Sequence, residues 1–424
     1  MKRLFCVMLT ALMLLCGCNI DTADNTPEST DAVYPPDVHG KLSDEPLTLN
    51  RHMSLQYANG SIYAIIGRNQ GECAYPVRYN CTSGRISTVC PDPLCLHENE
   101  ECPLIGIQQC IVLPDGRVCY SQKFDHIYRN DAGVIIKEVH IFDHALFDPI
   151  AGKKTVLYEY DGSYFTGPEL YTDNYRFYHS IEYDEERELF VTGLYRMNLK
   201  NGDIKLLLEH GTSEKDDAFN VSSEMIGIFN ERIYLSDGLS IFSIDFEGEK
   251  RITHLEGKYP VLEPLHADGE YVYYQREDGV YRQSLSSGKE EHIVKCNNIY
   301  GNFTLTTNWI YYQAGDTITI GKVDIDGYAA REAELSGGEI YRCTHDGSEL
   351  TKIAEMNGEY AHLRPNSMTV AGEYIYATYT GWQDKNGDSI FTRDEQLASG
   401  YSRTSLQILR IDTTSGEITT ITLK

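Results

Sequence analysis

Three cysteines and a histidine are concentrated in one short stretch, where they could bind a metal ion. The stretch reads Cys90-Pro-Asp-Pro-Leu-Cys95-Leu-His97-Glu-Asn-Glu-Glu-Cys102, so three thiols and an imidazole lie within thirteen residues. A soft set of three sulfurs and one nitrogen suits tetrahedral Zn²⁺. The spacing C-x4-C-x-H-x4-C does not match a zinc knuckle. A metal clip, meaning a bound ion that holds this segment together, is one of two interpretations. The other is disulfide bonding, which is common in proteins of oxidising, extracytoplasmic compartments.

Four further cysteines flank this stretch and are candidates for disulfide bonds. Seven of the twelve cysteines of the chain fall between Cys73 and Cys119. Cys73 with Cys81, or Cys110 with Cys119, could join neighbouring strands. Disulfides are favoured over a metal clip in this region, and reduced thiols are the third alternative. In each case we expect a structural role, pinning a long insertion between two repeating units.

A twelve-residue segment near the C-terminus has the oxygen pattern of a calcium-binding loop. Side-chain oxygens fall at positions 1, 3, 5, 9 and 12, and position 7 offers a backbone carbonyl. Ca²⁺ prefers six or seven oxygen ligands in such an arrangement. Ser389 stands at position 6, where glycine usually permits a sharp turn, and the alternative is an acidic, solvated hairpin loop. The expected ligands are Asp384, Asn386, Asp388, Ile390, Thr392 and Glu395.

The sequence contains no signature of the common enzyme classes. There is no G-x-S-x-G, no H-E-x-x-H, no G-x-G-x-x-G after a strand and no G-x-x-x-x-G-K-[ST]. Carboxylates are so numerous that many pairs could be proposed as a catalytic acid and base. The sequence therefore favours no particular pair. We therefore name no catalytic residue and expect no organic cofactor. Calcium is the expected metal, and zinc is less favoured.

These motifs are set in a chain that repeats a two-part pattern from about residue 50 onward. The first part is a turn and a short aromatic strand, as in Ala371-Gly-Glu-Tyr-Ile-Tyr376, and the second is a hairpin turn such as Ile411-Asp-Thr-Thr-Ser-Gly416. Seven first parts alternate with seven second parts. Four strands per unit, repeated seven times, predict an all-β fold that is a single seven-bladed β-propeller over residues 49–424. Six blades, eight blades or two β-sandwiches are the alternatives.

Composition agrees with a β-rich protein and excludes one class of partner. The 424 residues include 31 Tyr and 13 Phe but only 2 Trp, and tyrosine suits half-buried pleated surfaces. The net charge is −26. Such a surface repels phosphate backbones, so we expect no nucleic-acid partner.

The N-terminus predicts export and lipid attachment. A basic start, Met1-Lys2-Arg3, precedes an apolar run that is too short to span a bilayer. The run ends in Leu15-Cys16-Gly17-Cys18, which resembles a bacterial lipobox, although Cys16 is unusual at its position. Residues 1–17 are then the signal peptide, Cys18 is the lipidated residue, and residues 18–48 include a disordered acidic tether. Removing Lys2 and Arg3 leaves 35 basic against 63 acidic groups, a net charge of −28.

The lipobox, the acidic tether and the repeats, taken together, make the chain similar to the exported β-propeller lipoproteins of Gram-positive gut bacteria. Its repeats resemble those of TolB and of the propellers related to the low-density-lipoprotein receptor. The resemblance covers about residues 50–424 and rests on the Gly-Glu-Tyr-Ile-Tyr and Ile-Asp-x-x-x-Gly turns. It implies a fold and an extracytoplasmic location at the bacterial cell membrane, and it implies no catalytic residues.

Three functions follow as hypotheses. The first is a non-catalytic binding or scaffold module at the cell surface, because propellers present loops around a central channel and tyrosine-rich rims suit glycans, peptides or proteins. The second is a carbohydrate-active hydrolase or lyase that uses rim carboxylates. The third is an envelope assembly protein resembling TolB. The expected partners are the membrane, through the lipid, and an unidentified extracellular ligand.

Overall fold

The chain divides into two units, residues 1–32 and 33–424, and every residue described below belongs to the second. Within some strands only the backbone is described. The computed structural model describes residues 55–66, 74–92, 95, 102–113, 115–129, 135–160, 165–213, 224–237, 239–256, 266–276, 278–296, 299–315, 318–324, 331–336, 338–357, 360, 362–382, 390–392, 396–398 and 406–423.

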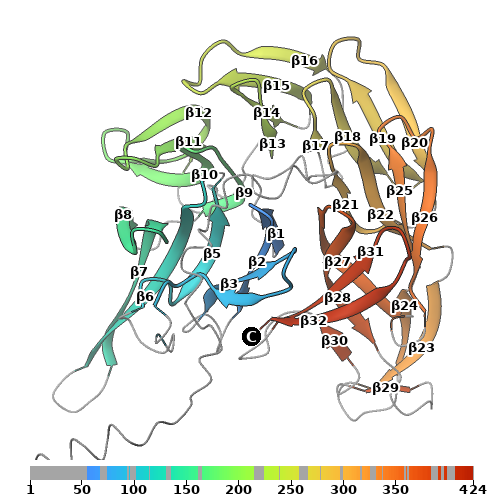
Figure 1. The fold of residues 1–424 in the computed structure, drawn as a ribbon. Coiled ribbons are helices and arrows are strands. Elements are labelled where there is room, and N and C mark those ends of the chain that lie inside the picture. The colour runs from blue at the N-terminus through green and yellow to red at the C-terminus, as the bar shows by residue number, and fades with distance from the viewer. Residues whose placement is uncertain are drawn as a thin grey trace, which may run out of the picture. The chain divides into compact units, whose positions relative to one another are not determined.

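The described chain is all-β, and its main body consists of seven four-stranded antiparallel sheets that follow one another in the sequence (Figure 1). Blade 1 contains β1 (Leu55–Ala58), β2 (Ser61–Ile66), β3 (Tyr75–Asn80) and β4 (Ile86–Thr88). Blade 2 contains β5 (Ile107–Val112), β6 (Val118–Arg129), β7 (Ile135–Asp148) and β8 (Lys153–Tyr160). Blade 3 contains β9 (Phe165–Tyr171), β10 (Tyr175–Asp184), β11 (Leu189–Asn198) and β12 (Ile204–Ser213). Blade 4 contains β13 (Glu224–Phe229), β14 (Arg232–Ser236), β15 (Ser240–Asp245) and β16 (Ile252–Glu256).

The remaining three blades follow the same order. Blade 5 contains β17 (His266–Ala267), β18 (Tyr271–Arg276), β19 (Gly279–Ser284) and β20 (Glu290–Lys295). Blade 6 contains β21 (Ile299–Leu305), β22 (Trp309–Ala314), β25 (Glu339–Thr344) and β26 (Leu350–Glu355). Blade 7 contains β27 (His362–Ala371), β28 (Tyr374–Trp382), β31 (Leu406–Asp412) and β32 (Ile418–Leu423). The fold is therefore a seven-bladed β-propeller, and the prediction of seven blades is confirmed.

Hydrophobic cores between neighbouring blades hold the ring together. Each of the seven blade-to-blade interfaces has its own cluster of buried side chains. The cluster that joins the last blade to the first contains Tyr376 and Ile408 of blade 7 and Leu55 and Ile62 of blade 1. Each buried aliphatic side chain of this kind contributes roughly 1.5–3 kcal/mol. The ring is thus closed by packing between blades 7 and 1, and each of these two blades is built from one end of the described chain.

The repeated Asp/Asn-x-x-x-Gly pattern forms the turn between the third and fourth strands of a blade. In blade 7 the carboxylate of Asp412 accepts hydrogen bonds from the backbone N–H groups of Thr414 (2.8 Å) and Ser415 (2.8 Å). Gly416 closes this turn at φ +75°, a conformation that L-residues rarely adopt. A Cβ at Gly416 would lie 2.5 Å from the backbone oxygen of Ile353, in the outer strand of blade 6. The turn glycine therefore also allows the hairpin to rest on the preceding blade.

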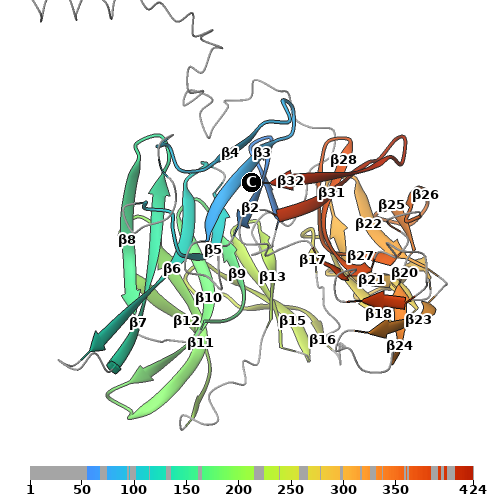
Figure 2. The ribbon, with the colours of Figure 1, turned by 90° about the horizontal axis from the view of Figure 1, so that it is seen from below.

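The two ends of the blades differ in the length of their connections. Strands 1–2 and 3–4 of each described blade are joined by two to six residues, and antiparallel pairing puts all of these turns at one end, which we call the turn face. Connections between strands 2 and 3, and between blades, lie at the opposite end, which we call the loop face. Every connection of eight or more residues between the strands of the described blades is at the loop face. In Figure 2 the short β31–β32 hairpin lies in the upper part of the view, and the strands β23 and β24 lie below it.

Two long loop-face connections pair with each other outside the blades. The connection within blade 6 contains β23 (Ile318–Asp324) and β24 (Arg331–Ser336), and the connection within blade 7 contains β29 (Ile390–Thr392) and β30 (Gln396–Ala398). β29 pairs in parallel with β23, and β24 completes a three-stranded sheet. β30 pairs with the end of β28. This additional length lies in connections between strands, and it links blades 6 and 7.

Candidate functional site

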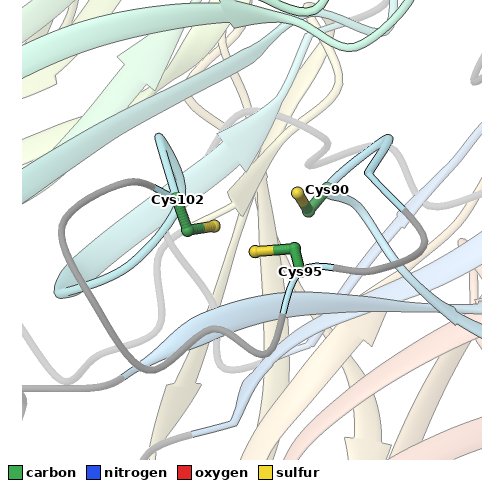
Figure 3. A group of neighbouring side chains, drawn as sticks. All are labelled: Cys90, Cys95 and Cys102. Carbon is green, nitrogen blue, oxygen red and sulfur yellow. The ribbon is translucent and has the colours of Figure 1, made fainter.

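The structure brings the sulfur atoms of Cys90, Cys95 and Cys102 together at the loop face. Each sulfur lies within 4.8 Å of the other two, and Figure 3 shows all three turned toward the space between them. Cys90 and Cys102 are buried and Cys95 is half-buried. Cys90 follows the last strand of blade 1 and Cys102 precedes the first strand of blade 2. His97, the fourth residue of the sequence motif, lies outside the described residues.

The surrounding backbone holds these three cysteines in place. The side-chain hydroxyl of Thr88 donates to the carbonyl oxygen of Cys90 at 3.3 Å. The N–H of Cys95 donates to the oxygen of Asp92 at 3.2 Å, and the N–H of Ile105 donates to the oxygen of Cys102 at 3.3 Å. Each cysteine therefore takes part in a local backbone turn or cap.

Two of the thiols share a proton. A hydrogen bond with Cys102 lowers the pKa of Cys90 to about 6, although burial acts in the opposite direction. The same contact, together with burial, raises the pKa of Cys102. The pair therefore gives up its first proton below the usual pKa of a thiol and its second above it. Thiolates are the form that binds metal ions.

The structure records no disulfide among the eight cysteines whose side chains it describes. Cys110 and Cys119 lie on the adjacent strands β5 and β6, but Cys110 is opposite Tyr120 and Ile111 is opposite Cys119. Side chains one residue apart along a strand point to opposite faces of the sheet. The two thiols therefore point to opposite faces of the sheet, and the structure does not join this candidate pair. Cys81 lies in the turn after β3, while its expected partner Cys73 lies outside the described residues.

Most of the expected calcium ligands lie outside the described residues. These are Asp384, Asn386, Asp388 and Glu395. Ile390 and Thr392 lie in β29, which pairs with β23. The residues flanking the motif, Trp382 and Gln396, are direct partners in the β28–β30 pair. Calcium binding here stays a prediction from the sequence.

A polar cluster buried between blades 2 and 3 was not expected from the sequence. The guanidinium of Arg176 forms two hydrogen bonds with the carboxylate of Glu169, and its Nε donates at 3.1 Å. The hydroxyl of Tyr171 donates to the same carboxylate. Burial would raise the pKa of Glu169, but the charge and hydrogen bonds of Arg176 outweigh burial and lower it to about 2. Glu169 is thus ionised and paired at neutral pH.

The same cluster contains a cysteine–histidine pair, in which the Sγ of Cys119 lies 3.3 Å from the Nε2 of His144. Burial raises the pKa of Cys119 to about 12 and lowers the pKa of His144 well below its usual value. Both groups are therefore neutral, and a protonated thiol away from solvent is a poor nucleophile. The arrangement is suited to packing between blades, and its chemistry is not that of an activated cysteine.

Cys18 and the rest of the predicted signal and tether lie outside the described residues. Within the described part of the chain, no helix has the length and apolar character needed to cross a bilayer.

Comparison with known proteins finds matches among solved structures only. No family model matches the chain, and no curated protein matches it in sequence. A solved prolyl endopeptidase matches with a TM-score of 0.49 and 11% identity, over 89% of this chain and 50% of that chain. TolB from Acinetobacter baumannii matches with a TM-score of 0.38 and 13% identity, over 69% of this chain and 63% of that one. A chain of a nidogen/laminin complex matches with a TM-score of 0.31 and 10% identity, over 66% of this chain and 89% of that one.

TolB, which the repeats resemble, is thus among the structural neighbours. This chain spans half the length of the prolyl endopeptidase that it matches. At these identities and TM-scores the matches assign no function to this chain.

Proposed function

We propose that this protein is a membrane-anchored β-propeller of the bacterial cell surface that acts as a non-catalytic binding or scaffold module. The supporting observation is the asymmetry between its two faces. All turns on the turn face are short, whereas every long connection between the described blades emerges at the loop face. Loops held by a rigid scaffold are where proteins commonly place recognition residues. The loop face is therefore the proposed binding surface.

Exposed apolar side chains at the loop face support a ligand that contacts rings and apolar groups. Tyr183, at the loop-face end of β10, is 53% exposed, and its ring lies 5.2 Å from that of Phe190. Leu239, in the connection between β14 and β15, is 70% exposed. Aromatic side chains at such positions stack on sugars and pack against peptides. The proposed ligand is accordingly a glycan, a peptide or a protein.

The proposed anchor is a lipid on Cys18. Two acyl chains hold a protein on a membrane stably, whereas one holds it only marginally. The body has an excess of acidic groups and is repelled by anionic headgroups, so it contributes no membrane affinity of its own. The lipid would hold the protein on the membrane, and the segment after Cys18 would let the propeller stand away from the membrane surface.

Binding to glycan and peptide arrays tests the proposal most broadly, with the full chain expressed in a bacterial host and extracted from membranes. We expect at least one class of glycan or peptide to bind, and mass spectrometry to recover the bound ligand chemically unchanged. Cleavage of a bound glycan or peptide by the purified protein would contradict a non-catalytic role. A stable complex with envelope proteins, recovered from the same membranes, with no array binding would instead favour the assembly role.

A further inference from the structure

The three cysteines of the loop-face cluster differ from the other described cysteines because their sulfurs converge on one point. Cys90, Cys95 and Cys102 approach from three parts of the segment between β4 and β5, and each sulfur is within 4.8 Å of both others. A disulfide requires only two sulfurs and leaves a third without a role in the bond. Convergence of all three is the arrangement that one metal ion requires.

The dimensions of the cluster fit a tetrahedral metal site. Zinc–sulfur bonds of about 2.3 Å place the sulfurs of a tetrahedron about 3.8 Å apart. This separation falls within the 4.8 Å that encloses the three atoms. Sulfur ligands select Zn²⁺ and similar soft ions over Ca²⁺ or Mg²⁺, which prefer oxygen.

The residues that flank the cluster are held by contacts with two blades. The N–H of Val89, next to Cys90, donates to the oxygen of Pro76 in blade 1 at 3.1 Å. The hydroxyl of Tyr120 in blade 2 donates to the oxygen of Pro103, next to Cys102, at 2.6 Å. Val89 and Leu104 are buried in the core shared by blades 1 and 2. The ligands are therefore positioned by the propeller itself.

We propose that Cys90, Cys95 and Cys102 bind one Zn²⁺ ion and that this ion ties the end of blade 1 to the start of blade 2. On binding, each thiol that is still protonated releases its proton to solvent, and three thiolates and Zn²⁺ leave a site charge of −1. The site is structural, because it lies in the core between two blades. A tetrahedral ion has a fourth position, for which the sequence offers His97; the proposal rests on the three sulfurs alone.

Metal content of the full chain tests this site. The protein is purified in chelator-free buffer under conditions that keep thiols reduced, and zinc is counted by mass spectrometry. We expect about one zinc ion per chain in the wild type and at least a tenfold lower content in Cys95→Ser. Cys296→Ser is the matched control, since Cys296 is also half-buried and lies outside the cluster. It should retain its zinc.

Two further measurements guard against a variant that merely folds poorly. Cobalt substituted into the wild type should give a thiolate-to-metal charge-transfer band that is lost in Cys95→Ser and kept in Cys296→Ser. In the wild type, a strong chelator should make all three cluster thiols reactive toward an alkylating reagent. The proposal is overturned by undiminished zinc in Cys95→Ser, by a zinc-free wild type, or by a disulfide between any two cluster cysteines.

Discussion

Arg176 and Glu169 form an ion pair that is almost completely buried, with 1% of the arginine side chain and 7% of the glutamate side chain exposed. The pair joins the two inner strands of blade 3 and faces the core shared with blade 2. Because neither charge is exposed to water, each one is stabilised in the folded protein mainly by the opposite charge of its partner.

Replacing Glu169 by Gln should destabilise the propeller by roughly 3–5 kcal/mol, because the Arg176 charge is left buried without a counter-charge. The folded-state pKa of Glu169, about 2, lies below its usual 4.5. Its contribution is therefore fully present above about pH 4.5 and is lost as the pH falls toward 2. Urea unfolding at several pH values should show a shallower loss of stability between pH 5 and pH 3 in Glu169→Gln than in wild type. Identical pH dependence in both would show that the pair does not act in this way.

Two turn glycines allow a matched test of how blades dock. Gly416 and Gly60 have similar φ values, +75° and +71°, but only Gly416 faces a close neighbour, the oxygen of Ile353, whereas Gly60 has nothing within 4 Å. Gly60→Ala should cost about 1–2 kcal/mol from the backbone conformation alone. Gly416→Ala should cost a further 1–3 kcal/mol or so, because the hairpin must move away from blade 6. Thermal unfolding of both variants measures the difference, and equal losses would mean that the close approach has no energetic role.

Much of this fold was predictable because its repeats are local. A turn such as Asp412 to Gly416 depends on a few adjacent residues, so seven such turns alternating with seven aromatic strands were sufficient to predict the number of blades. The unpredicted features depend on contacts between distant segments. The parallel pairing of β29 with β23 joins two blades, and the Glu169–Arg176 pair needs the register of β9 against β10. The candidate pair Cys110 and Cys119 also depends on register, since an offset of one residue reverses the face to which a side chain points.

Lipid attachment can be tested by labelling cells with a fatty-acid probe. Cys18→Ser should lose the label and should either accumulate as a precursor or be released from membranes, because no acyl chain is then attached. Cys16→Ser is the control and should keep both label and membrane location. If the label is retained in Cys18→Ser and lost in Cys16→Ser, then Cys16 and not Cys18 carries the lipid, which would contradict the prediction.

Calcium should stabilise the protein through the segment from Asp384 to Glu395. With a dissociation constant of roughly 10⁻⁴ to 10⁻³ M, typical of extracellular sites, saturating Ca²⁺ should raise the melting temperature measurably. Glu395→Gln should abolish this rise, since the last position of such a loop supplies two oxygens. The exposed turn-face residue Glu373 offers a control, and Glu373→Gln should respond like wild type. A calcium response of equal size in Glu395→Gln would exclude this segment as the site.

The binding affinity of loop-face and turn-face variants for an array-identified ligand tests the proposed function most directly. Tyr183→Ala and Leu239→Ala alter the loop face, whereas Ile150→Ala removes an equally exposed apolar side chain, 66% exposed, from the turn between β7 and β8. Truncating an interface anchor commonly costs more than 1 kcal/mol. We expect at least a fivefold weaker affinity in one or both loop-face variants and no change in Ile150→Ala. Weaker binding in Ile150→Ala alone, or conversion of the ligand to product by the wild type, would contradict it.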